Sequence, residues 1–229
     1  MSLLRSPREL LSTACAVASV VGYRQNDDMT VALTYRDRML ADGTDKGEWM
    51  RVRATGITAT DVARLSSPSA IPQAALEKLH GSSFTGNAYT RHGQDREPFI
   101  AAWVLENFGI TSNQGLFHAA EDRRHLATPD GIGELAEGLV LAEIKTSGKP
   151  LDEIPANYMR QIHWQQYVLG AQRTLFVWEQ HKDFVPLHSE PRIQWIDRDD
   201  AAIDDVLKRA GALIAEIVRL RQASGQASA

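Results

Sequence analysis

A short turn and the strand after it constrain this chain more than any other feature. Thr-Pro-Asp-Gly at 128–131 is followed twelve residues later by Glu-Ile-Lys at 143–145, directly after an apolar run. Alternate side chains of a strand point to the same face, so Glu143 and Lys145 should project side by side. A hairpin through the glycines after the turn would bring Asp130 up to meet them. Two carboxylates and an ammonium group at one point are costly unless something binds there, and a divalent cation with a phosphodiester fits.

The composition places the chain among globular proteins and excludes several kinds of site. Its 229 residues predict one large domain, and the 43% hydrophobic content supports a real core. The single cysteine, Cys15, excludes a disulfide framework, a thiolate zinc site and an iron–sulfur cluster, and it suits a reducing compartment. The net charge is −4, so any nucleic-acid binding would have to use a local basic channel.

The N-terminal segment allows two interpretations. Arg5 and Arg8 precede the largely apolar run Leu10–Gly22, as in a signal peptide. However, Glu9 stands directly before the run and polar residues interrupt it, which favours a buried amphipathic helix over 6–22. No run is apolar enough to span a bilayer, so we expect no membrane partner.

Periodicity and turn residues predict an α/β (α+β) fold with a central mixed sheet flanked by helices. The order of the elements around the turn is helix, three strands, helix and strand. Helices are predicted over 6–22, 59–66, 72–80, up to Phe108, 156–169 and 199–220, and strands over 30–35, 115–119, 124–129, 138–146, 174–179 and 192–196.

Asp130 and Glu143 are the predicted metal ligands, and the carbonyl of Ile144 between the two strand side chains can add a third. Ligation by oxygen alone favours Mg²⁺, with Mn²⁺ as a substitute, and we expect two ions. Lys145 would hold or activate the attacking water and stabilise the developing phosphorane charge. The alternative is a solvent-facing hairpin with an ordinary Glu–Lys alternation. The preceding turn and apolar strand favour the catalytic interpretation.

Two helices offer further polar candidates. Glu97 lies one turn before the apolar stripe of its helix, as a boundary residue or as a metal ligand directed at the sheet. The motif downstream favours the ligand. Tyr158, Gln161 and Gln165 share one face of the later helix. Gln161 could bond the nucleophile, a metal water or a phosphate; the alternative is an exposed polar face.

Arg53 and Thr60 bracket a Gly-Ile-Thr-Ala-Thr turn before a short helix. A guanidinium, a hydroxyl and a helix N-terminus can together bind phosphate. Local sequence alone favours a surface arginine and an N-cap threonine instead. Arg91, Arg96 and Lys149, near the turn and strand motifs, are candidate contacts to a DNA backbone, although each could be a solvated surface charge.

Five segments in order resemble the phage lambda-type exonucleases, the viral recombination nucleases of the PD-(D/E)XK superfamily. They lie at Arg53–Val62, Gly93–Pro98, Ala127–Ile132, Glu143–Ser147 and Tyr158–Tyr167. The resemblance implies a PD-(D/E)XK restriction-endonuclease-like core. It also implies a magnesium-dependent 5′→3′ exonuclease that digests one strand of double-stranded DNA and leaves a 3′ overhang for a single-strand annealing protein.

In that family the core Asp, Glu and Lys are catalytic, which here means Asp130, Glu143 and Lys145. The helix Glu matches Glu97 and the motif Gln matches Gln161. Arg53 and Thr60 match the residues that hold the terminal 5′-phosphate or nearby backbone, although the family often has Ser where this chain has Thr60.

The resemblance also implies a domain organisation and a setting for the protein. We expect an N-terminal extension over 1–45, a nuclease domain over 46–222 and a disordered tail over 223–229. Some family members form ring-shaped trimers, and the expected location is the cytoplasm of a bacterial or phage-infected cell. The alternatives are a structure- or sequence-specific endonuclease on the same core, or a DNA-binding module without activity. The intact charged triad argues against the inactive module.

Overall fold

A computed structural model describes residues 34–81, 86–136 and 138–226. The predicted helix over 6–22 and Cys15 lie outside these residues. Of the predicted strand over 30–35, the described end is not extended: Tyr35 has helical backbone angles and leads into a 3-10 helix, η1 (Arg36–Arg38). Among the described residues, no helix has the length and apolar character needed to cross a membrane.

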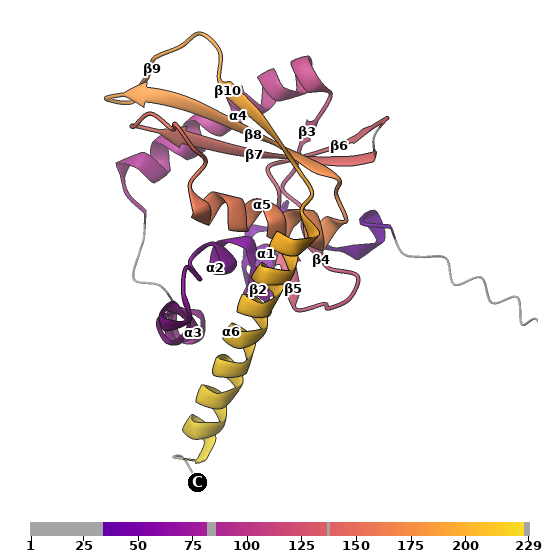
Figure 1. Cartoon of the computed structure of the whole chain (residues 1–229), viewed down its shortest axis with the longest axis vertical. Coiled ribbons are helices and arrows are strands. Elements are labelled where there is room, and N and C mark those ends of the chain that lie inside the picture. Colours follow the sequence, from indigo (N-terminus) through magenta and orange to yellow (C-terminus); the bar gives the residue numbers. More distant parts are fainter. Residues whose placement is uncertain (1–33, 82–85, 137, 227–229) are drawn as a thin grey trace, which may run out of the picture. The chain divides into compact units, whose positions relative to one another are not determined.

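The larger sheet is the central mixed sheet that the sequence predicts. Its strands follow the order β10–β8–β7–β6–β3, and β9 pairs with the last residues of β8 (Figure 1). Strands β7 and β8 are parallel and all other neighbours are antiparallel. The strands are β3 (Thr111–Ser112), β6 (Gly131–Leu135), β7 (Gly138–Ser147), β8 (Arg173–Lys182), β9 (Val185–Pro186) and β10 (Arg192–Asp197).

Two helices cover the opposite faces of this sheet, α4 (Ala88–Phe108) and α5 (Ala156–Leu169) (Figure 1). The even-numbered residues at the centre of β7, such as Val140, lie in one core cluster with Ile100 and Val104 of α4. Odd-numbered Leu141 lies in another cluster with Trp164 of α5. Because strand side chains alternate between faces, Glu143 and Lys145 of β7 belong to the α5 side.

A second sheet of four strands packs against α5, in the order β1–β4–β5–β2. Helix α5 therefore lies between the two sheets (Figure 1). Only β2 and β5 are parallel, with Ile57 opposite His125. These strands are β1 (Met39–Ala41), β2 (Ile57–Thr58), β4 (Leu116–His118) and β5 (His125–Ala127).

Residues 34–45, which the sequence assigns to an N-terminal extension, pack against the core. Strand β1 pairs with β4, and the Arg38 side chain is buried. Its guanidinium donates to the carbonyl oxygens of His118, at 2.6 Å, and of Val168 and Leu169 at the end of α5. The carbonyls of Val168 and Leu169 have no partner within the helix because they lie in its last turn, so Arg38 satisfies them. The predicted boundary at residue 45 thus falls inside a continuously packed region.

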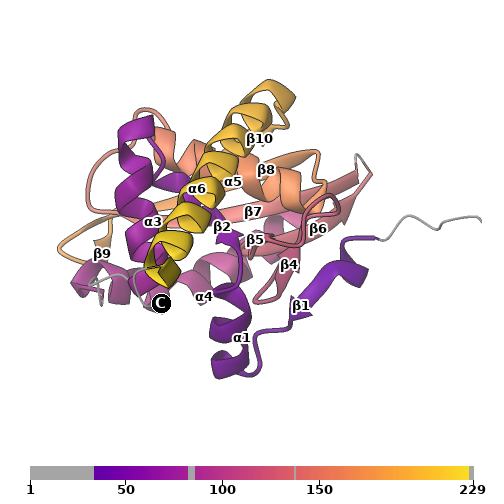
Figure 2. The same cartoon turned by 90° about the horizontal axis from the view of Figure 1, so that it is seen from below.

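The remaining helices flank α5. The long helix α6 (Asp200–Gln226) packs along α3 (Ile71–His80) and α5, as Figure 2 shows for α3. It continues past its predicted end at Leu220, so residues 223–226 are helical and not part of a disordered tail. Residues 227–229 lie outside the described part. Shorter helices are α1 (Lys46–Arg53), α2 (Ala59–Ala63) and η2 (Pro68–Ala70).

Local signals account for most helix boundaries. Helix α4 begins after an Asn87 N-cap and ends at Gly109, whose left-handed φ of +67° suits glycine. Pro98 lies inside this helix and does not start it. Helix α1 was not predicted, because it buries no residue and so has no apolar stripe to detect. Its N-cap, Asp45, lies within the polar segment 43–47, which begins and ends with glycine.

Candidate active site

The hairpin of β6 and β7 brings Asp130, Glu143 and Lys145 together. The β6–β7 ladder ends where Gly131 pairs with Ala142, so the backbone N–H of Ile144 has no partner on β6. That N–H instead donates to Asp130 Oδ2 at 2.7 Å. Lys145 Nζ donates to Glu143 Oε1 within the same strand. The three predicted charged residues therefore converge at the end of the ladder.

Helix α5 holds the Glu143 carboxylate in a single orientation. Glu143 has no exposed surface. Gln161 Nε2 donates to its Oε1 at 2.5 Å and Gln165 Nε2 donates to its Oε2 at 2.8 Å. Buried charges need such partners, and both amides come from one helix face at a spacing of four residues. The sequence placed Gln165 on this face but gave it no role, although its amide donates to Glu143 as that of Gln161 does.

The electrostatics of the cluster favour a bound cation. Burial and the charge of Glu143 raise the pKa of Asp130 well above its ordinary value, and Lys145 only partly opposes this. Burial alone would lower the pKa of Lys145, but the carboxylates of Glu143 and Asp130 outweigh burial and raise it. One ammonium group thus compensates incompletely for the carboxylates around it.

Glu97 approaches this cluster without joining it. It lies on α4, which packs on the face of the sheet opposite to Glu143, and its side chain is exposed. The pKa of Glu97 is raised, mainly by partial desolvation. Lys145 opposes this shift and Glu143 adds to it, so the charges interact at a distance. Among the described residues, no three His, Cys, Asp or Glu side chains form a ready metal cage. The role of Glu97 as a metal ligand therefore stays a prediction, supported by its electrostatic coupling to Asp130 and Glu143.

The donor set nevertheless suits a hard divalent cation. Asp130, directly before β6, and Glu143, in the middle of β7, supply carboxylate oxygens. In a strand, the N–H and C=O of one residue point to the same edge, so the Ile144 carbonyl points toward Asp130 with its N–H. Such oxygen ligands match Mg²⁺ or Mn²⁺ rather than a soft metal.

Arg53 and Thr60 meet beside this cluster. Arg53 Nη2 donates to Thr60 Oγ1 at 3.1 Å and approaches Thr58 Oγ1 at 3.5 Å. Thr58, and not Thr60, is the N-cap of α2, where it forms a capping box with Asp61. The Thr60 hydroxyl is thus not used as a cap. Because α2 has only five residues and Asp61 lies in its first turn, the expected attraction of an anion to this helix terminus carries no weight.

A cavity of about 220 Å³ joins the Arg53–Thr60 pair to Asp130 and Gln161. Its wall includes Trp49 and Thr128, neither of which the sequence singled out. Thr128 Oγ1 and Trp49 Nε1 are buried and have no hydrogen-bond partner among the described residues. Unpartnered buried donors beside a guanidinium point to a ligand that accepts hydrogen bonds. The only feature of the sequence that could have indicated a role for Thr128 is its position two residues before Asp130.

The three predicted backbone contacts differ in their surroundings. Arg96 donates to both carboxylate oxygens of Glu179, at 2.8 and 2.6 Å, and Glu179 is buried. Its two guanidinium donors are therefore engaged within the protein, and its role as a phosphate contact stays a prediction. Arg91 and Lys149 are exposed, and the described part of the chain offers neither of them an ion pair.

Replacing Arg96 with glutamine should destabilise the fold by about 1–3 kcal/mol, because Glu179 keeps its buried charge without a cation. Urea unfolding measures this free energy. Arg91→Gln on the same helix is the matched control and should change stability by less than about 0.5 kcal/mol. Unchanged stability for Arg96→Gln, together with weaker DNA binding, would show that Arg96 contacts phosphate rather than stabilising Glu179.

Comparison with known proteins agrees with this architecture. The family model described as YqaJ-like viral recombinase domain matches residues 48–172, more than half of the chain. No curated protein matches the chain. An alkaline exonuclease (LHK-Exo) from Laribacter hongkongensis is 25% identical, with 80% of this chain and 98% of that chain covered and a TM-score of 0.62.

Two other solved structures share the fold. LHK-Exo in complex with dAMP is 24% identical, with 80% and 98% of the two chains covered and a TM-score of 0.62. A phage-related exonuclease from Haemophilus somnus 129PT is 14% identical, with 74% and 96% covered and a TM-score of 0.59. These likenesses confirm the predicted PD-(D/E)XK-like core, and the family match confirms the resemblance to viral recombination nucleases. The chain belongs to the YqaJ-like viral recombinase domain family.

Proposed function

We propose that this protein is a DNA exonuclease that digests one strand of a duplex from its 5′ end and leaves a 3′ overhang. The observation that carries this proposal is the 220 Å³ cavity between Arg53–Thr60 and Asp130–Gln161. A phosphate held by the first pair would lie a fixed distance from a phosphodiester at the second. Such an arrangement sets the cleaved bond at a fixed distance from the terminal phosphate of a strand. An endonuclease does not require this.

Within this proposal, Asp130, Glu143 and the Ile144 carbonyl hold a divalent cation, Mg²⁺ or Mn²⁺. The cation would supply Lewis-acid chemistry by lowering the pKa of water and by neutralising charge on the phosphate. The carboxylates provide its ligands, and the amides of Gln161 and Gln165 keep Glu143 in place for that task.

Lys145 acts on the reacting phosphate itself. Its side chain is partly exposed, and its ammonium group is bonded to Glu143 and lies 5.4 Å from the centre of the Tyr158 ring. There it would orient water and stabilise the negative charge that develops on the phosphoryl oxygens. The water oxygen bonds to phosphorus and the bond from phosphorus to the 3′ oxygen breaks. The 3′ oxygen takes a proton, and a 5′-mononucleotide leaves.

Arg53, Thr60 and Thr128 bind the 5′-phosphate that positions this reaction. Burial lowers the pKa of Arg53, so its half-buried guanidinium lacks the hydration it would have in solvent and gains from an anionic partner. The complex of LHK-Exo with dAMP, a nucleoside monophosphate, agrees with a mononucleotide product. Arg91 and Lys149 are proposed contacts to more distant backbone. A ring-shaped trimer and a single-strand annealing partner remain predictions from the resemblance.

Linear duplexes labelled at one end or the other, with and without a 5′-phosphate, test the proposal in Mg²⁺. We expect mononucleotides from the 5′-labelled strand first, faster with the phosphate, and no reaction after the cation is chelated. Cutting of covalently closed circular DNA would instead favour an endonuclease. Release from the 3′ end would contradict the proposed polarity.

Replacing Arg53 with alanine should remove the advantage of a 5′-phosphate. Hydrogen bonds to a charged group contribute about 1.5–3 kcal/mol, so kcat/KM on phosphorylated ends should fall about 10- to 100-fold. Initial rates on phosphorylated and hydroxyl ends measure this, with exposed Arg51 in the same helix as the matched Arg→Ala control. If Arg53→Ala slowed both substrates equally, the residue would not read the phosphate.

A further inference from the structure

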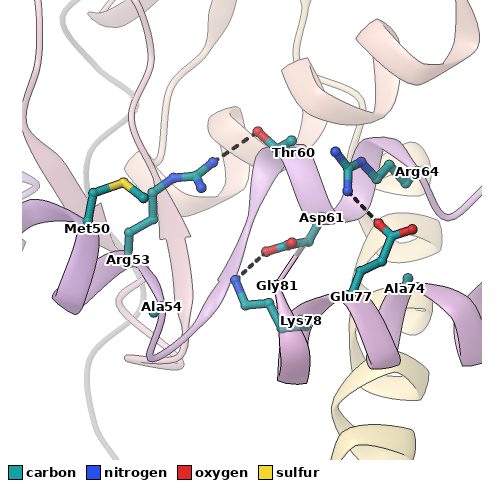
Figure 3. Close-up of a pocket in the computed structure, with 10 residues that line it drawn as sticks. All are labelled: Met50, Arg53, Ala54, Thr60, Asp61, Arg64, Ala74, Glu77, Lys78 and Gly81. Carbon is teal, nitrogen blue, oxygen red and sulfur yellow. Dashed lines mark hydrogen bonds and ion pairs between the residues drawn. The ribbon is translucent and has the colours of Figure 1, made fainter. Parts of the chain in front are cut away.

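A second cavity, of about 390 Å³, lies on the other side of the Arg53–Thr60 pair. Both residues line it as well as the cavity that reaches Asp130. Figure 3 shows the larger side chains of the remaining wall, which come from α1, from α2 and the residue after it, and from α3: Met50, Asp61, Arg64, Glu77 and Lys78. The volume falls in the range of roughly 300–1,000 Å³ that small ligands occupy in proteins. A strand end bound at Arg53 and Thr60 would therefore have room beyond it.

The wall combines cationic donors with carboxylate acceptors. Lys78 pairs with Asp61 and Arg64 pairs with Glu77, each at 2.8 Å (Figure 3). An ammonium has three donors and a guanidinium five, so both cations keep donors free for a ligand. The two carboxylates disfavour a further phosphate, but they accept bonds from hydroxyl and amino groups. This chemistry suits an uncharged nucleoside attached to a bound phosphate better than it suits a chain of phosphates.

We propose that this cavity binds the nucleoside on the 5′ side of the phosphate held by Arg53 and Thr60. The inference rests on the proposed exonuclease function and adds a substrate class to it: strands that end in a 5′-hydroxyl. Such a strand has no terminal phosphate, so the pair can hold only the first internucleotide phosphate. The strand then lies one nucleotide further in, and its first nucleoside occupies the cavity.

This shift changes the first product. On a phosphorylated end, the first internucleotide linkage lies at Asp130 and Glu143, and a mononucleotide leaves. On a hydroxyl end, the second linkage lies there. Water adds its oxygen to that phosphorus, the bond to the 3′ oxygen of the second nucleotide breaks, and this oxygen takes a proton. The product is a dinucleoside monophosphate, and the shortened strand now carries a 5′-phosphate, so later turnovers release mononucleotides.

The test uses the full-length protein and two duplexes that differ only in the 5′-phosphate. Reactions are stopped within the first turnover, and the products are identified by mass spectrometry. We expect a mononucleotide from the phosphorylated end and a dinucleoside monophosphate from the hydroxyl end. A free nucleoside from the hydroxyl end, or no digestion of it, would overturn the inference alone. Failure to release mononucleotides from the phosphorylated end would overturn the proposed function itself.

A variant that fills the cavity locates the nucleoside. Met50 is 53% exposed on a helix that buries no residue, so Met50→Trp should fold normally and occupy the space. Dinucleoside release should fall by about tenfold or more, as expected when a pocket excludes its ligand, while phosphorylated ends are digested as before. Met39→Trp, at an exposed position that does not line the cavity, is the matched control. Unchanged dinucleoside release by Met50→Trp would contradict the assigned cavity.

Discussion

Replacing Lys145 with glutamine should reduce DNA cleavage by about 10²–10³-fold, the usual effect of losing one preorganised group that stabilises the transition state. Glutamine is the informative replacement because Glu143 is wholly buried and receives a hydrogen bond from Lys145. Alanine would leave the carboxylate with only its two amide donors, and the fold would lose stability. A glutamine side chain can still donate to Glu143 while removing the positive charge.

Single-turnover digestion of a 5′-phosphorylated duplex measures how far Lys145→Gln lowers the cleavage rate. The melting temperature, recorded on the same sample, separates lost chemistry from lost folding. Lys208→Gln is the matched control, since it removes a charge from an exposed position of α6 that is not among the proposed DNA contacts. Normal cleavage by a folded Lys145→Gln protein would remove this side chain from the mechanism.

Replacing Asp130 with asparagine should abolish cleavage and yet stabilise the protein when no cation is present. The pKa of Asp130 in the folded state lies above its value in the unfolded chain, so the folded state binds the proton more tightly. Ionisation of Asp130 therefore disfavours folding as the pH rises above about 3.9. Asparagine removes that charge and keeps an oxygen that can accept from the Ile144 N–H.

Thermal melting with and without Mg²⁺ distinguishes this effect from a simple loss of structure. The unmodified protein should gain stability on adding Mg²⁺, because a ligand that binds only the folded state stabilises it. Asp130→Asn should melt higher than the unmodified protein without Mg²⁺ and should gain little when Mg²⁺ is added. Asp204→Asn, on the exposed side of α6, controls for the change in net charge. A lower melting temperature for Asp130→Asn without Mg²⁺ would mean that the carboxylate is a structural partner.

The contrast between Gln161 and Arg96 shows which contacts the sequence could identify. Gln161 and Glu143 belong to elements with clear periodicity, and a helix packed on a buried strand must direct one face at it. Arg96 lies close in sequence to the motif of its helix, but nothing local indicates that Glu179 on β8 would occupy its guanidinium. That pairing depends on how α4 lies across the sheet.

Glu97 and Thr128 also show that local sequence does not specify how distant segments pack. The helical stripe directs Glu97 toward the sheet, but local sequence cannot show that α4 covers the face opposite to Glu143 while the charges of the two residues still interact. Thr128 carries no periodic signal, yet its hydroxyl is buried in the cavity wall beside Arg53. In both cases the deciding quantity is the packing of segments that are distant along the chain.

The sequence alone determined most of the helices and strands of this protein and the position of its charged motif. Strand alternation places Glu143 beside Lys145, the glycine-rich hairpin delivers Asp130, and the helices follow from apolar periodicity and capping residues. These are local rules with periods of two and 3.6 residues. Only the tertiary structure decided that Gln165 joins Gln161 on Glu143 and that Arg53 lines both the cavity that reaches Asp130 and a second cavity. Those contacts join segments up to about a hundred residues apart, and they form because apolar faces must pack together, which no local period specifies.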